Sequence, residues 1–148
     1  MASFSDELNS MADRAREAED TERRHRTQER ERHEQAVDRA RALEREIDAA
    51  LDQAAKGDRY TLRVEPPATP YADARGWTVW WLEPQPVRGL ELLLVHDDAK
   101  LRWAWIQDSP RPMRWLTEDV THFTVERDLR NLLRRLADTE AWKSGRLP

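Results

Sequence analysis

The sequence predicts an α+β fold, with a long N-terminal helix, an antiparallel β-meander of four or five strands, and a C-terminal amphipathic helix packed on the sheet. Three observations predict it. Residues 5–56 contain neither Pro nor Gly. After Gly57 the apolar residues alternate with a period of two, and after Thr124 a period near 3.6 returns. The expected order is therefore helix, sheet, helix.

The first predicted helix is rich in Ala, Glu, Arg and Gln, which are strong helix formers. Its apolar residues near the start follow helical spacing, at Leu8, Met11, Ala15 and Ala18. The next positions on that face are charged: Glu22, His25, Glu29 and Arg32. Small and apolar residues then resume the stripe, at Ala36, Val37, Ala40, Leu43, Ile47, Ala50, Leu51 and Ala54.

This uneven stripe predicts two segments with different tasks. We expect residues 1–34 to form a charged helical arm, because their apolar residues have no obvious site within the chain. We expect residues 35–148 to form a Trp-rich α+β domain that includes the second half of the first helix.

Alternating apolar residues predict the strands of the domain. The expected ranges are residues 59–65, 77–82, 90–96 and 100–107, with a short fifth strand at 113–116. Pro66 and Pro67 end the first strand and favour an edge position. The second to fourth strands are apolar on both faces, so both faces need a cover. We expect the helix over residues 125–137 to cover one face and residues 36–55 to cover the other.

Composition excludes several classes of protein. The chain has no Cys, which excludes disulfides, thiolate zinc sites and thiol nucleophiles. No apolar run reaches the 18 to 20 residues that span a bilayer, and residues 1–10 lack the pattern of a signal peptide, so we expect a cytoplasmic protein. Arg outnumbers Lys by 22 to three, a bias typical of GC-rich bacterial genomes.

These observations favour a non-enzymatic bacterial interaction protein, an adaptor, inhibitor or regulator. It would bind a protein partner, or itself as a homodimer, through Leu8, Met11, Ala15 and Ala18 of a coiled-coil-like arm and through part of the Trp-rich sheet. Of the seven Trp residues, six lie between residues 77 and 116. We expect most of them to be core, and the remainder to be available to a partner.

Nucleic-acid binding is an alternative. The last helix carries a basic stripe that would contact phosphate, formed by Arg127, Arg130, Arg134 and Arg135, and one or two exposed Trp residues would stack on unpaired bases. Acidic residues dilute this basic stripe, and the net charge of -4 arises from basic and acidic residues mixed at short range.

A small enzyme is the second alternative, with His96 or His122 beside neighbouring carboxylates. No phosphate-binding loop, metalloprotease helix or nucleophile elbow occurs. His25, Glu29 and His33 share a helix face, but their spacing is a poor match to a metal site. We therefore predict no cofactor, no metal and no catalytic residue.

Overall fold

The computed structural model describes residues 3–56, 61–67, 70–83, 87–106, 113–116 and 118–144. Its elements are α1 (Phe4–Ala55), β1 (Leu62–Glu65), β2 (Ala74–Trp81), β3 (Arg88–Val95), β4 (Lys100–Ile106), β5 (Arg114–Trp115), α2 (Val125–Ala137) and α3 (Thr139–Ser144). Contacts divide the chain into two compact units, Met1–Gln35 and Ala36–Pro148. The second unit holds the sheet, and α1 belongs to both.

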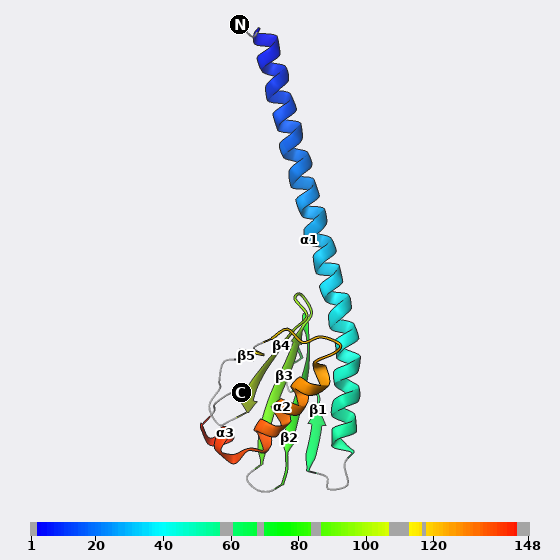
Figure 1. Ribbon diagram of the computed structural model, residues 1–148, viewed down its shortest axis with the longest axis vertical. Helices are drawn as coiled ribbons and strands as arrows, with labels where there is room; N and C mark the ends of the chain where they lie inside the picture. Colours follow the sequence, from blue (N-terminus) through cyan, green and yellow to red (C-terminus); the bar gives the residue numbers. More distant parts are fainter. Residues whose placement is uncertain are drawn as a thin grey trace. The chain divides into compact units, whose positions relative to one another are not determined.

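The sheet is an antiparallel meander with the strand order β1-β2-β3-β4-β5 (Figure 1). This confirms the predicted α+β class and the fifth strand. The observed strands differ from the predicted ranges by a few residues at their ends. The predicted residues 59, 60 and 107 lie outside the described part of the chain.

One face of the sheet carries the core. Trp77 and Trp103 both pair with Leu92, so the three side chains share that face. A single cluster of buried residues joins this face to α1 and to α2; its helical members are Ala40, Leu43, Ile47, Leu51, Val125, Leu129, Leu132 and Leu136. Each large apolar side chain buried in this way stabilises the fold by about 1.5–3 kcal/mol.

The prediction that residues 36–55 cover the opposite face of the sheet is wrong. Both helices pack on the same face, because the buried residues of α1 and α2 belong to one cluster with the same alternate set of strand residues. The physical reason is that each helix has a narrow apolar stripe. Two such helices side by side are needed to cover one broad sheet face.

Within the described residues, rings rather than a helix cover the opposite face of the sheet. A Cβ on Gly76 would lie 2.9 Å from a ring carbon of Pro67, so the segment after β1 lies against the sheet there. A Cβ on Gly89 would lie 2.6 Å from the indole of Trp80, so that indole lies over the glycine on the neighbouring strand. Because Gly76 and Gly89 have no side chain, the rings of Pro67 and Trp80 can pack directly against the backbone of the sheet.

The C-terminal end of α2 is held by a buried arginine on β3. Arg88 is 2% exposed. Its guanidinium donates to the carbonyl oxygens of Leu136 (3.3 Å) and Ala137 (2.7 Å) and to the hydroxyl of Thr139 (2.6 Å). A cation at this position satisfies carbonyls that have no partner within the helix and interacts favourably with the helix dipole. Arg88 therefore fixes α2 and α3 to the sheet.

Candidate functional site

The helical arm, residues 3–35, begins with a capping box. The backbone amide of Asp6 donates to the Ser3 hydroxyl, and the Ser3 amide donates to the Asp6 carboxylate, both at 3.2 Å. Every residue of the arm is exposed in the single chain. The arm is therefore a regular helix without an internal hydrophobic support.

An apolar strip runs along the start of the arm. The predicted residues Leu8, Met11, Ala15 and Ala18 are all exposed and lie at helical spacing on one face. The prediction omitted Phe4, which lies four residues before Leu8 and extends the strip. Phe4 is 75% exposed, Leu8 49% and Met11 61%. Extending the same spacing by one turn would have identified Phe4 from the sequence.

A charged seam continues the strip along the arm; its residues are Glu22, His25, Glu29 and Arg32. Glu22 accepts a hydrogen bond of 2.7 Å from Arg26, and His25 lies 3.0 Å from Glu29. Each exposed pair contributes only a few tenths of a kcal/mol. The helix at the charged seam is therefore supported only weakly by ion pairs between neighbouring turns. Among the described residues no group of three His, Cys, Asp or Glu side chains is placed to hold a metal ion.

A groove lies between α1 and α2 in the second unit. We call it the α1–α2 groove; it has a volume of about 290 Å³ and is lined by Ala50, Leu51, Gln53, Ala54, Glu126, Leu129, Arg130 and Leu133. Beside it, His122 pairs with Glu46 of α1. The next residue, Phe123, is 91% exposed. The domain thus has a groove of mixed polar and apolar lining between α1 and α2, and an exposed aromatic ring just before α2.

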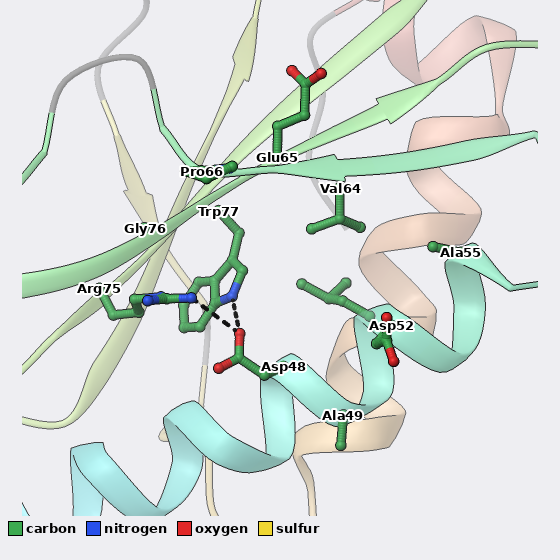
Figure 2. Close-up of a pocket in the computed structure, with 11 residues that line it drawn as sticks. Asp48, Ala49, Asp52, Ala55, Val64, Glu65, Pro66, Arg75, Gly76 and Trp77 are labelled. Atoms are coloured by element: carbon green, nitrogen blue, oxygen red, sulfur yellow. Dashed lines mark hydrogen bonds and ion pairs between the residues drawn. The ribbon is translucent and has the colours of Figure 1, made fainter.

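A second groove, between residues 48–55 of α1 and the first two strands, is larger, at about 530 Å³. Figure 2 shows Asp48 reaching from α1 toward Arg75 and Trp77 of β2. Asp48 accepts 2.7 Å and 3.4 Å hydrogen bonds from the Trp77 indole and the Arg75 guanidinium. The Arg75 guanidinium carbon also lies 5.5 Å from the centre of the Trp77 ring. These contacts anchor α1 to the sheet.

No pattern in the sequence predicts this second groove. Asp48 is separated from Arg75 and Trp77 by a helix end and a strand, and no local pattern links a carboxylate on a helix with an indole on a strand. Since its carboxylate already holds two donors, we assign Asp48 a structural role.

The four arginines of the nucleic-acid alternative are only partly brought together. Arg127, Arg130 and Arg134 lie at helical spacing on the exposed side of α2, whereas Arg135 is half-buried on another side. Arg127 also lies 3.6 Å from a Glu118 oxygen. The exposed basic face is therefore three residues long and partly neutralised.

The tryptophans serve mainly as core, as expected. Of the seven, only Trp115 is exposed, at 41%. The Arg102 guanidinium lies 3.5 Å from the centre of its ring, so one ring face is already covered by a cation. The faces needed for stacking on bases or on a partner are therefore scarce in the described part of the chain.

The two histidines of the enzyme alternative lie in different surroundings. The His122 side chain is 74% exposed and pairs with Glu46. Nε2 of His96 lies 3.6 Å from Oε2 of Glu44, beyond hydrogen-bond distance. Asp98 accepts from the Lys100 amide at 3.0 Å, which is the turn chemistry of the β3–β4 hairpin. Asp98, one of the carboxylates near His96 in the sequence, therefore has a structural role in this turn.

One titratable group on the sheet is clearly perturbed. The Tyr71 hydroxyl donates to the Glu91 carboxylate. This hydrogen bond, together with partial burial and the negative charge of Glu91, raises the pKa of Tyr71 to about 12. A phenol with such a high pKa stays protonated near neutral pH, so we assign the pair a structural role.

No helix in the described part of the chain has an apolar stretch long enough to cross a membrane. Comparison of the chain with protein-family models, with curated proteins and with solved structures finds no match among any of them.

Proposed function

We propose that this protein is a non-enzymatic interaction protein, an adaptor, inhibitor or regulator, that binds a protein partner or a second copy of itself through its helical arm. One observation carries the proposal. Residues 3–35 form a capped helix in which every residue is exposed, including the large apolar side chains of Phe4, Leu8 and Met11. Helices in proteins gain most of their stability from packing an apolar face. The arm is a helix that still lacks that packing.

The apolar strip alone supports weak binding. Full burial of a Phe, Leu or Met side chain contributes about 1.5–3 kcal/mol. In a symmetric dimer the strip supplies three such side chains from each copy, a gross gain on the order of 10 kcal/mol. Association costs about 4–15 kcal/mol in lost freedom of motion. Tight binding therefore requires further contacts, from the charged seam or from the exposed part of the sheet near Trp115.

The test compares full-length variants by light scattering. Leu8→Glu/Met11→Glu places two charges in the strip, and the matched control Asn9→Glu/Ala12→Glu places two charges on another side of the same exposed helix. We expect the wild type and the control to be dimeric, and the strip variant to be monomeric. A wild-type chain that is monomeric at about 100 µM, where complexes of micromolar affinity form, would exclude self-association.

If the wild type is monomeric, binding of the arm to a different protein is tested by a pull-down with the same pair of variants. A partner retained equally by the strip variant and by the control would contradict a role for the arm.

Nucleic-acid binding is the second candidate, and the exposed face formed by Arg127, Arg130 and Arg134 favours it. Binding through phosphate contacts weakens steeply with salt. Arg130→Glu/Arg134→Glu should then abolish quenching of Trp fluorescence by a single-stranded oligonucleotide at about 50 mM salt, a concentration at which phosphate contacts are strong. If the oligonucleotide does not quench the Trp fluorescence of the wild type at this salt concentration, nucleic-acid binding is excluded.

A further inference from the structure

The groove between residues 48–55 of α1 and the first two strands, which we call the α1–sheet groove, has an apolar floor. Leu51 and Trp77 line it and are 2% and 3% exposed. Figure 2 shows Val64 pointing from β1 toward α1, whereas the next residue, Glu65, points away from α1. The volume of about 530 Å³ lies within the roughly 300–1,000 Å³ of ligand pockets. Among the described residues, the groove therefore has room for a side chain of another molecule.

One flank of the α1–sheet groove carries a row of carboxylates. Glu44, Asp48 and Asp52 follow one another at intervals of four residues, so they lie along one side of α1. Asp48 and Asp52 line the groove. The row therefore places negative charge beside the apolar floor.

Arg75 of β2 shows how this row holds a cation. Its guanidinium donates to Asp48 at 3.4 Å and lies 4.0 Å from a Glu44 oxygen. The guanidinium carbon also lies 5.5 Å from the centre of the Trp77 ring. Arg75 thus combines ion pairs to the row with an interaction between its cation and an aromatic ring. A basic side chain is therefore the kind of group that this part of the domain accommodates.

Asp52, one helical turn beyond Asp48, has no cation of the sheet within ion-pair distance in the described part of the chain. It pairs instead with Lys56 of the same helix, at 2.8 Å. The two side chains are 65% and 74% exposed, so this pair contributes little to stability and a new partner can replace it. On the strand side, Glu65 already pairs with Arg63 at 3.0 Å. Asp52 is therefore the carboxylate of the groove that is best placed to receive a cation from outside.

We propose that the α1–sheet groove binds an Arg or Lys side chain of a protein partner, with the aliphatic stem over Val64 and the charged head at Asp52. Long basic side chains pack their stems along apolar surface and keep the charged head in a polar environment. The occupant repeats, one helical turn farther along α1, the contact that Arg75 makes with Asp48. The inference goes beyond the proposed function, because the groove lies in the second unit and uses no residue of the arm.

An NMR titration of the full-length protein tests the proposal with a defined probe, acetyl-Gly-Arg-Gly-amide. We expect this Arg peptide to shift the amide resonances of residues 48–55 and 64–66 and the indole N–H resonance of Trp77, with saturation at millimolar concentrations. The control peptide has citrulline in place of Arg, which keeps nearly the same shape without the charge. It should bind at least about tenfold more weakly. No saturable shift at these residues, or equal affinity of the two peptides, would overturn the proposal.

Two variants of the protein form a matched pair. Asp52→Asn removes the charge at the groove, and Asp38→Asn removes a charge about 21 Å away along the same helix. Both residues are exposed, so both variants should fold. Asp52→Asn should weaken binding of the Arg peptide by at least about tenfold, whereas Asp38→Asn should leave it within about twofold of the wild type. If both variants bind the Arg peptide equally well, the proposal is wrong.

The apolar floor has its own test. A peptide with Lys in place of Arg is compared with one that carries 2,3-diaminopropionic acid, whose side chain has the same charged group on a stem shorter by three methylenes. The shorter stem loses its contact with Val64 and Leu51, so this peptide should bind at least about tenfold more weakly. Equal affinities would contradict the docking of the stem on the floor and would overturn the proposal.

The arm variant Leu8→Glu/Met11→Glu separates this inference from the proposed function. Since the groove contains no residue of the arm, this variant should bind the Arg peptide as the wild type does. A wild-type chain that is monomeric and binds no partner through the arm would contradict the proposed function and leave the peptide site intact. Loss of peptide binding in the arm variant would overturn a site confined to the second unit.

Discussion

Arg88 offers the sharpest test of the energetics of this fold. Its guanidinium is 2% exposed and donates three hydrogen bonds at the junction of α2 and α3. Hydrogen bonds from a charged group contribute about 1.5–3 kcal/mol each, and a buried acceptor left without a partner costs about 1–3 kcal/mol. The carbonyls of Leu136 and Ala137 both lose this donor in Arg88→Ala. We therefore expect the free energy of unfolding to fall by about 3–5 kcal/mol.

This loss is large compared with the 5–15 kcal/mol or so that stabilises a typical domain. Urea unfolding followed by Trp fluorescence measures it as a lower midpoint with an unchanged slope. Arg88→Lys keeps the charge but has a single donor nitrogen, so it should cost less than Arg88→Ala.

Arg63→Ala is the matched control for Arg88→Ala. Arg63 is exposed and forms an ion pair of 3.0 Å with Glu65, so its removal should cost less than about 1 kcal/mol. If Arg88→Ala and Arg63→Ala lower the stability equally, the reasoning about the buried cation is refuted.

Three further predictions use the same unfolding assay. Ile47→Ala should lower the free energy of unfolding by about 2–5 kcal/mol, because the side chain is fully buried, and a cost under about 1 kcal/mol would contradict the packing of α1 on the sheet. Gly89→Ala should cost about 1–3 kcal/mol and shift Trp emission, because the new Cβ displaces the Trp80 indole; unchanged stability would contradict the close approach. The pKa of Tyr71 is raised above its ordinary value of 10.0 to about 12, so the hydrogen bond to Glu91 stabilises the folded state fully below pH 10 and this contribution is lost as the pH rises toward 12. Tyr71→Phe should remove this alkaline loss, and an unchanged pH profile would contradict the assignment.

The sequence alone predicted the elements of the domain well, for a physical reason. A period of two places alternate side chains on opposite faces of a strand, and Trp77 and Leu92 obey it as neighbours on one face. The prolines that end the first strand, and the helical spacing of the apolar residues in α2, can likewise be read from a short stretch of sequence. Local signals of this kind specify which elements form and in which order.

The arrangement of layers could not be predicted in the same way. The pattern showed that both faces of β2 and β3 are apolar, but an apolar face does not specify what covers it. The structure covers one face with two helices and the other with rings such as Trp80, seated on Gly89. The contacts of Arg88 and Asp48 were missed for a related reason, since each joins residues far apart in the chain.

In the helical arm, the spacing of apolar residues along the sequence does not show whether they are buried. Leu8 in the arm and Leu43 in the domain follow the same helical spacing, yet Leu8 is 49% exposed and Leu43 is 5% exposed. Periodicity identifies the apolar face of a helix, but it does not show whether another part of the same chain covers that face, because cover depends on residues far away in the sequence.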